Sequence, residues 1–337
     1  MTDLGIVVVG RNEGQRLARC LTSVLASSAP LIYVDSGSTD SSVSVARSLG
    51  LPVRELDPAR PFSAARARNE GFEQLCAVTP GLRYVQFVDG DCELGTEWLT
   101  AGRTELERVP QVAIACGHIR ELHADASPYN RMCSLEWEGT PGDVQSCGGN
   151  FMIRAEAFRA VGGFRTDVVA AEDDELCLRV RRTGSRIRLL AVEMVRHDAA
   201  LLRFSQWWRR ATRCGHAYAL GHALHGSEPE HHFRHELVSV VAWGGVLPAA
   251  ALAGLPLTLG ASSWLLAAYP VLGLRIYRRG RERGWSPQDA RLYAAFTVLS
   301  KLPGFLGAIR FHLDRWRGRH PVLIEHKEAC HEPAPKP

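Results

Sequence analysis

The stretch Gly5-Ile-Val-Val-Val-Gly10 decides the fold, because it places a buried strand at the start of the chain. Ile6–Val9 is a continuous apolar run of strand length. Arg11–Gly14 follows as a turn, and from Arg16 to Leu25 apolar residues recur at helical spacing. The chain therefore begins with a strand, a turn and a helix.

The same order of elements continues to about residue 200. Further strands are expected at 31–34, 53–56 and 84–88, and helices at 43–49, 63–76, 97–108 and 171–183. Strands that alternate with helices predict an α/β fold with a doubly wound, mostly parallel sheet. Ligands of such sheets bind beyond the carboxyl ends of the strands, where Asp35 and Asp89 stand. Residues 110–165 are less regular.

Composition excludes several classes of protein. With 23% charged and 46% hydrophobic residues, the 337-residue chain has enough apolar side chains for a folded core. A net charge of only +4 argues against a dedicated nucleic-acid binder. The nine cysteines are scattered and form no C-x-x-C pair, which favours a reducing compartment over a disulfide framework or a zinc cluster.

A change of composition near residue 237 predicts membrane association. Leu237–Leu274 contains no charged residue, and it is long enough for two short membrane spans with a turn at Gly260–Ser263. The basic cluster Arg275–Arg283 follows, and the positive-inside rule places it in the cytoplasm. The alternative is a buried helical hairpin of a soluble protein. Residues 290–313 are apolar with interspersed charges, which favours an amphipathic helix at the membrane interface.

The amino terminus supports the same orientation. The run Gly5–Gly10 is too short for the apolar region of a signal peptide. We therefore expect the first domain to stay in the cytosol, and a two-span hairpin would return the chain to that side.

Asp89-Gly-Asp91 is the first candidate for chemistry. Two carboxylates two positions apart, just past a strand, can converge on one hard divalent cation. Such a cation would neutralise charge on a diphosphate leaving group. The alternative is an ordinary turn, since Asp and Gly are frequent turn residues.

Two further acidic motifs lie at the expected edge of the sheet. Asp35-Ser-Gly-Ser-Thr-Asp40 is either a contact for a base or ribose hydroxyl or an Asx turn that caps the next helix. Glu172-Asp-Asp-Glu175 is either the source of a general base or a solvated helix start. Mutual repulsion among these four carboxylates raises their pKa values, in the direction that a base needs.

Several short motifs occur along the chain in one order. They are Gly10-Arg-Asn-Glu-Gly14, Asp35-Ser-Gly-Ser-Thr-Asp40, Ala67-Arg-Asn-Glu-Gly71, Val88-Asp-Gly-Asp91, Gly162-Gly-Phe164 and Glu172-Asp173. Each motif is unspecific, but the ordered set resembles the family 2 glycosyltransferases with the GT-A fold. The resemblance covers roughly residues 4–215.

The resemblance implies a site for a nucleotide-sugar donor, with a UDP-sugar expected. Asp35 would contact the nucleotide, and Arg68 would lie near the donor. The donor-binding set implied by the motifs is Asn12, Glu13, Asp35, Arg68 and Asp89.

The resemblance also implies metal-dependent chemistry. Asp89 and Asp91 would bind Mg²⁺ or Mn²⁺ together with the diphosphate, and Asp173 would be the catalytic base. His197 falls where some GT-A enzymes place a further metal or phosphate contact, although a structural histidine is an equal alternative. The expected sugar and acceptor pocket is formed by Gly148, Gly149, Asn150, Glu172, Trp208 and Arg209.

One motif departs from the family's processive polysaccharide synthases. Gln206-Trp-Trp-Arg-Arg210 resembles their Q-x-x-R-W element, but Arg210 stands where the last Trp belongs. Processive polymerisation is therefore not expected. An interfacial helix that presents Trp and Arg to lipid is the simpler interpretation.

These observations predict an inverting glycosyltransferase at the inner (plasma) membrane, with a cytoplasmic catalytic domain and a lipid-linked or glycan acceptor, in cell-envelope or exopolysaccharide synthesis. The expected parts are a catalytic domain at 1–215, a polar juxtamembrane linker at 216–236, a hydrophobic hairpin at 237–277, and a basic loop, interfacial helix and tail at 278–337. The alternatives are a non-catalytic membrane scaffold and a sugar-phosphate nucleotidyltransferase. The second would need a longer Gly-rich basic loop after the first strand.

Overall fold

The computed structural model describes residues 3–319, which form two compact units. The first unit comprises residues 3–123 and 137–199, and the second comprises residues 124–136 and 200–319. The tail expected at the end of the chain lies outside the described residues, as does Cys330. The eight cysteines within the described residues form no disulfide with one another.

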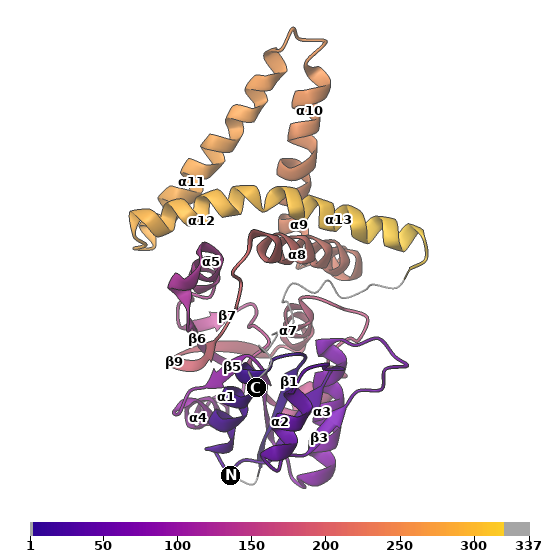
Figure 1. The fold of residues 1–337 in the computed structure, drawn as a ribbon, viewed down its shortest axis with the longest axis vertical. Coiled ribbons are helices and arrows are strands. Elements are labelled where there is room, and N and C mark those ends of the chain that lie inside the picture. The colour runs from indigo at the N-terminus through magenta and orange to yellow at the C-terminus, as the bar shows by residue number, and fades with distance from the viewer. Residues whose placement is uncertain (1–2, 320–337) are drawn as a thin grey trace, which may run out of the picture. The chain divides into compact units, whose positions relative to one another are not determined.

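A nine-stranded sheet forms the centre of the first unit (Figure 1). Its strands lie in the order β3-β2-β1-β4-β8-β6-β9-β5, and β7 pairs with β9. The strands are β1 (Leu4–Gly10), β2 (Leu31–Asp35), β3 (Val53–Glu55), β4 (Tyr84–Asp89), β5 (Cys92–Leu94), β6 (Val112–Glu121), β7 (Gly142–Val144), β8 (Phe151–Arg154) and β9 (Arg186–His197).

The first four strands are parallel, which confirms the predicted α/β class. In β1 and β2 the apolar residues are buried on both faces, as in parallel sheets covered by helices. The register places Gly10 beside Asp35 on one flank of β1 and Val9 beside Asp89 on the other. Both acidic motifs therefore begin at the same edge of the sheet.

The remaining strands make the sheet mixed. β8 is antiparallel to β4 and β6, and β5 and β7 are antiparallel to β9. The long parallel pair β6 and β9 was not expected from the sequence. β9 contains the apolar run Leu189–Val192, but charged residues flank that run on both sides, and the register of β9 with β6 shifts near Gly117.

The helices of the first unit lie close to their predicted positions, except for α6, which the sequence did not predict. They are α1 (Gln15–Leu25), α2 (Ser42–Ser48), α3 (Ala64–Val78), α4 (Trp98–Arg108), α6 (Ala155–Ala160) and α7 (Glu172–Arg182). Ser63 caps α3, since its side chain accepts a hydrogen bond from the Arg66 amide. In the core, the indole nitrogen of Trp98 donates to Gln86 Oε1 at 2.7 Å, which satisfies both buried polar groups.

The second unit is helical among its described residues. Its helices are η1 (Ala124–Ala126), α5 (Pro128–Glu136), α8 (Phe204–His225), α9 (Arg234–Val241), η2 (Ala242–Val246), α10 (Leu247–Gly254), η3 (Ala261–Ala267), α11 (Ala268–Glu282), α12 (Pro287–Leu299) and α13 (Lys301–Trp316). Within this unit, α10 and α11 form the arms of a hairpin, and α12 and α13 run across its base (Figure 1).

Small residues allow α8 and α13 to cross in direct contact. A Cβ atom at Gly215 would collide with the backbone carbonyl of Gly304. A Cβ atom at Gly307 would collide with the carbonyl of Thr212. The two helices therefore pack backbone against backbone, and a larger side chain at either position would separate them.

Residues 216–225, which the sequence placed in a polar linker, form the second half of α8. His216 and His225 are buried, with 3% and 6% of their surface exposed. The ring of His216 packs edge-on against Phe311 at 5.4 Å, and burial lowers the pKa of its imidazole. Both histidines are therefore core residues of the second unit, and α13 covers His216 through Phe311.

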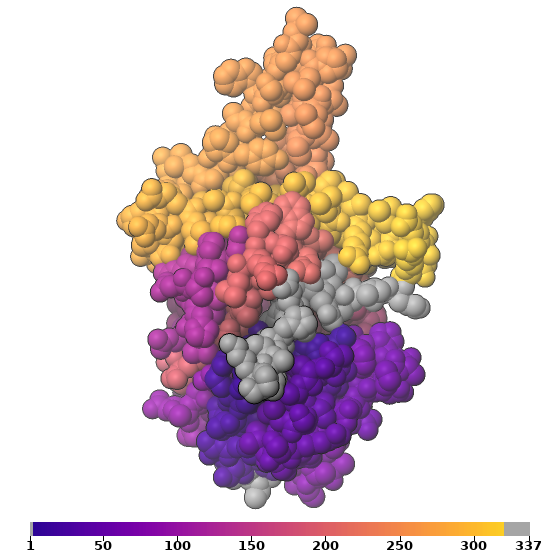
Figure 2. All heavy atoms as spheres, in the orientation of Figure 1, coloured from indigo at the N-terminus to yellow at the C-terminus, as the bar shows by residue number. Residues whose placement is uncertain are grey.

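The apolar hairpin leaves large side chains uncovered. Leu257, Leu259 and Trp264 are 86%, 99% and 79% exposed. The turn between the arms uses a left-handed conformation at Gly260, close to the turn expected from the sequence. Figure 2 shows the hairpin, in orange, as a projection of the second unit.

A close approach at Gly71 fixes α3 against the sheet. A Cβ atom there would collide with Val7 and would lie 2.9 Å from Val34 Cγ2. We expect Gly71→Ala to lower the free energy of unfolding by about 3 kcal/mol, since the packed strands cannot move aside. Gly81→Ala is the matched control, because Gly81 has open space and only a positive φ, so about 1 kcal/mol is expected. Urea unfolding followed by circular dichroism tests this, and equal losses would show that α3 is not held by this contact.

Candidate active site

The site at the carboxyl edge of the sheet begins with Asp35, the last residue of β2. Its carboxylate is buried and accepts hydrogen bonds from the Tyr33 hydroxyl at 2.8 Å and the Ser38 hydroxyl at 2.6 Å. The Ser38 amide donates to the other carboxylate oxygen at 2.7 Å. Burial and the neighbouring Asp35 raise the pKa of Tyr33, so Tyr33 remains a donor. Oδ1 accepts both hydroxyl hydrogen bonds, so Oδ2, which accepts only the Ser38 amide, keeps capacity for a further hydrogen bond.

The loop after β1 is tied to the loop after β2. The Asn12 amide donates to Ser38 Oγ at 2.9 Å, and Asn12 Oδ1 accepts from the Thr39 amide at 2.7 Å. The amide of Glu13 donates to Ser42 Oγ at 3.2 Å, and its carboxylate pairs with Arg16. Asn12 and Glu13 therefore hold the two loops together, and this fixes the loop that follows Asp35.

Arg68 on α3 joins two parts of the site. Its guanidinium donates to Asp89 Oδ1 and to Glu172 Oε1, both at 2.7 Å. Arg68 is 2% exposed, and burial opposes its charge, but Asp89 and Glu172 outweigh that effect and raise its pKa. A buried cation between two carboxylates thus connects the end of β4 to the start of α7.

The predicted pocket residues before β8 pack against this bridge. A Cβ atom at Gly149 would collide with the Arg68 guanidinium and lie 2.7 Å from Asp89 Oδ2, so a larger residue would have to displace the ends of both side chains. Asn150 is buried, and its side-chain oxygen accepts from the Asp89 amide at 2.9 Å. Its amide group donates to Asp89 Oδ2 at 3.3 Å. Gly148 has more room, since its nearest neighbour, Ile119, is 3.6 Å away.

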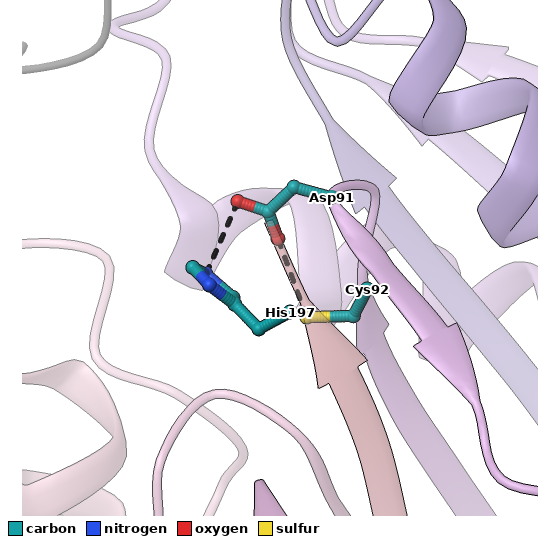
Figure 3. A group of neighbouring side chains, drawn as sticks. All are labelled: Asp91, Cys92 and His197. Atoms are coloured by element: carbon teal, nitrogen blue, oxygen red, sulfur yellow. Dashed lines mark hydrogen bonds and ion pairs between the residues drawn. The ribbon is translucent and has the colours of Figure 1, made fainter. Parts of the chain in front are cut away.

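Asp91 and His197 meet at the end of β9 (Figure 3). His197 Nε2 lies 3.4 Å from Asp91 Oδ2, and His197 Nδ1 lies 3.2 Å from Glu121 Oε2. The side chain of Glu121 is fully buried. Trp137 covers the imidazole edge-on at 4.5 Å. The ring is therefore fixed between two carboxylates.

Ligand atoms of Asp91, Cys92 and His197 lie within 4.8 Å of one another, close enough to hold one metal ion. Burial raises the pKa of Cys92 well above its usual range, so its thiol stays protonated and is a poor ligand. The Cys92 thiol instead contacts Asp91 Oδ1 at 3.3 Å. Carboxylate and imidazole donors suit Mg²⁺ or Mn²⁺, so the residues present fit a divalent cation.

Asp173 lies in the first turn of α7, beside Glu172. Burial, Asp174 and Glu172 raise the pKa of Asp173 well above its ordinary value, and Arg68 partly opposes this shift. The sequence predicted this direction from the cluster of carboxylates. A carboxylate with a raised pKa is a stronger base than an ordinary aspartate.

The remaining predicted pocket residues, Trp208 and Arg209, lie in the second unit. Both are on α8, where Trp208 packs against Phe204 with ring centroids 5.7 Å apart. Arg209 Nε donates to the Ser205 carbonyl at 3.3 Å. The other predicted site residues all belong to the first unit.

Glu121 and Tyr33 are site residues that the sequence did not indicate. Glu121 ends β6, a strand that was itself not expected, and nothing in the sequence pairs it with His197. Tyr33 stands two residues before Asp35, so the alternation of a strand places both side chains on one face. That spacing was a signal that could have identified Tyr33.

Two family models match this chain. The model described as "Glycosyl transferase family 2" matches residues 5–162, which include the strand-end motifs. The model described as "Glycosyl transferase family group 2" matches residues 84–300, or 217 of the 337 residues. The chain belongs to the family 2 glycosyltransferases.

Two curated proteins are distantly related to this glycosyltransferase in sequence. A TPR repeat-containing protein of Synechococcus elongatus is 31% identical over 135 residues, which cover 40% of this chain and 32% of the relative. The pre-mycofactocin glycosyltransferase of Mycobacterium tuberculosis is 28% identical over 212 residues, which cover 58% of this chain and 43% of the relative. The chain spans less than half the length of either.

Two solved structures resemble the glycosyltransferase along most of its length. One is the mannosyltransferase PcManGT from Pyrobaculum calidifontis in complex with GDP-Man and Mn²⁺, with a TM-score of 0.59 at 18% identity, covering 93% of this chain and 88% of that one. The other is S. aureus TarS 1-349 in complex with UDP, with a TM-score of 0.51 at 13% identity, covering 94% and 92%. These similarities confirm the GT-A fold.

Arg68→Met tests the bridge between Asp89 and Glu172. Removing the cation leaves a buried carboxylate without its partner, so we expect the free energy of unfolding to fall by about 3 kcal/mol. Arg54→Met is the control, since Arg54 is 53% exposed and its pair with Glu70 contributes less than about 1 kcal/mol. Chemical denaturation of both variants gives the comparison. An equal decrease in the free energy of unfolding of the two variants would mean that the Arg68 bridge stabilises the fold no more than an exposed ion pair does.

Proposed function

We propose that this glycosyltransferase is an inverting, metal-dependent enzyme that moves a sugar from a nucleoside diphosphate to a hydroxyl of a lipid-linked or glycan acceptor. The observation that supports this most directly is the Arg68 bridge, which couples Asp89 of the D-x-D motif to Glu172, the neighbour of Asp173. The two motifs that the chemistry needs are thereby fixed relative to one another.

Asp173 is proposed as the general base. Its carboxylate removes the proton from the acceptor hydroxyl, and that oxygen attacks the anomeric carbon from the face opposite the leaving group. The bond from the anomeric carbon to the diphosphate oxygen breaks, and the nucleoside diphosphate departs with that bond's electron pair. A single displacement of this kind inverts the anomeric centre. The raised pKa of Asp173 supports the assignment.

Asp89, Asp91 and His197 are the residues that would hold the divalent cation. When bound, the cation supplies positive charge that stabilises the diphosphate leaving group. Glu121 is proposed as a positioning residue, because a hydrogen bond from His197 Nδ1 to Glu121 leaves Nε2 free to ligate. Mn²⁺ accompanies the donor in the mannosyltransferase PcManGT, which supports a metal here.

The donor is proposed to be a UDP-sugar, with Asp35, Asn12 and Glu13 at the nucleotide and Arg68 near the diphosphate. PcManGT is in complex with GDP-Man and TarS with UDP, so both nucleobases belong in any screen. Gly148, Gly149, Asn150 and Glu172 are proposed to line the sugar pocket, with Trp208 and Arg209 contributing to the acceptor side.

The proposed location is the cytoplasmic face of the inner (plasma) membrane, in cell-envelope or exopolysaccharide synthesis. Two helices, Arg234–Gly254 and Pro287–Trp316, are long and apolar enough to cross a bilayer. Only 22% and 28% of their apolar windows are buried, which disfavours the core hairpin of a soluble protein. The crossing of α12 and α13 over the hairpin base supports an interfacial position for residues 290–313.

A donor screen tests the proposed reaction. Detergent-solubilised full-length protein is incubated with UDP- and GDP-sugars, Mg²⁺ or Mn²⁺ and lipid extract, and nucleoside diphosphate release and glycolipid formation are measured. We expect one donor to turn over, with a loss of at least about 100-fold in Asp91→Ala and on chelation. Asp198→Asn is a matched control outside the proposed ligand set. Turnover that survives chelation would overturn the metal assignment, and transfer only to soluble acceptors would overturn the lipid acceptor.

The dependence of kcat/KM on pH tests the base. Because the pKa of Asp173 is raised, activity should begin to fall with decreasing pH well above pH 4, as the base takes up a proton. Asp174→Asn removes a charge that raises this pKa, so the acid limb should move to lower pH. Asp173→Asn should lose activity at every pH, by about 1000-fold. An acid limb unmoved by Asp174→Asn would assign the titration to another group.

A further inference from the structure

The helices of the second unit line a partly open cavity that the proposed reaction does not use. It has a volume of about 290 Å³ and is formed by α5, α8, α9, α12 and α13. That volume equals about ten water molecules at about 30 Å³ each, enough for a small polar headgroup but not for a whole lipid. Its charged and aromatic lining includes Glu136, Arg210, Glu236, Lys301, Trp207 and Phe296.

Four charges line the cavity, and only two of them are paired. Arg210 and Glu136 form an ion pair at 2.7 Å, and the charge of Glu136 raises the pKa of Arg210. Lys301 and Glu236 face the same cavity and interact electrostatically, but they make no ion pair within 4 Å among the described residues. The cavity therefore offers one cation and one carboxylate to an occupant.

Four aromatic residues contribute to the wall of the cavity. Trp207 packs edge-on against Phe296 with ring centroids 5.0 Å apart, and Tyr218 and Tyr293 are the other two. Aromatic faces attract a cation that is partly shielded from water. An ammonium group is therefore favoured both by Glu236 and by the rings, while Lys301 favours a phosphate.

The cavity lies at the polar end of a candidate membrane helix. His235 and Glu236 belong to the first turn of Arg234–Gly254, and Lys301 begins α13. The apolar residues of that helix follow directly after the cavity residues in sequence. If this helix is inserted as proposed above, the cavity stands at the level of the lipid headgroups.

We propose that this cavity binds the headgroup of a membrane phospholipid that carries both a phosphate and a primary ammonium. The phosphate contacts Lys301, the ammonium donates to Glu236 and lies against the aromatic wall, and the acyl chains remain in the bilayer. A net charge of zero over the four lining charges matches a zwitterion better than an anion. The inference rests on the proposed membrane association but not on sugar transfer.

Native mass spectrometry of the detergent-purified full chain tests the site. Phosphatidylethanolamine, phosphatidylglycerol and free phosphoethanolamine are added separately, and bound adducts are titrated. We expect phosphatidylethanolamine to bind at least about tenfold more tightly than either other probe. Lys301→Gln and Glu236→Gln should each weaken this binding about tenfold. The controls are Arg310→Gln, on the same helix as Lys301, and Glu282→Gln on α11, which lie outside the cavity and should bind as the unmodified chain does.

Each outcome decides the proposal. Tighter binding of phosphatidylglycerol, or its gain in Glu236→Gln, would assign the site to anions and overturn the zwitterion. Equal binding of free phosphoethanolamine would assign it to a soluble ester. Unchanged binding in both cavity variants would place the lipid elsewhere. Donor turnover measured on the same preparations separates failure of this site from failure of the proposed reaction.

Discussion

The arrangement of the active edge depends on one buried cation, Arg68, held between Asp89 and Glu172. Burying a charge is unfavourable unless it is paired and hydrogen-bonded, so three elements must meet at one point for α3 to bury this arginine. Replacing a whole buried set of ion-paired residues by apolar ones can be neutral for stability, whereas removing one member is costly, so the value of the set lies in specifying geometry. Gly149 and Asn150 fit around the same contact, which extends the constraint to the loop before β8.

The part of the site that follows parallel strands could be predicted from the sequence. Apolar runs identified β1, β2 and β4, and the acidic residues that follow them stand at one edge because parallel strands end together. The start of α7 was also predictable, since four carboxylates in a first turn mark a helix start. The ordered motifs then indicated the family, which the family models confirm.

The contacts around His197 could not be predicted, because they depend on strand register. Glu121 and His197 lie side by side only through the pairing of β6 with β9, which contains irregular register shifts. β9 carries an apolar run at Leu189–Val192, but nothing in that run shows which strand it pairs with or in which register. The motifs predicted that Arg68 lies near the donor. Its hydrogen bonds to Asp89 and Glu172 became clear only from the side-chain geometry of the structure.

In the second unit, as in the first, a buried charge is stable only when it is paired. Arg210 is paired with Glu136, as Arg68 is paired with Glu172 in the first unit. Charges paired in this way need no ligand to neutralise them. Lys301 is half-buried and lies near enough to Glu236 for their charges to interact, but the two form no ion pair within 4 Å among the described residues. A half-buried cation without a hydrogen-bonded partner costs free energy unless an external group satisfies it. The apolar composition of these helices predicts that the second unit lies in or on a membrane. Only the positions of Lys301 and Glu236 indicate which ligand the cavity binds.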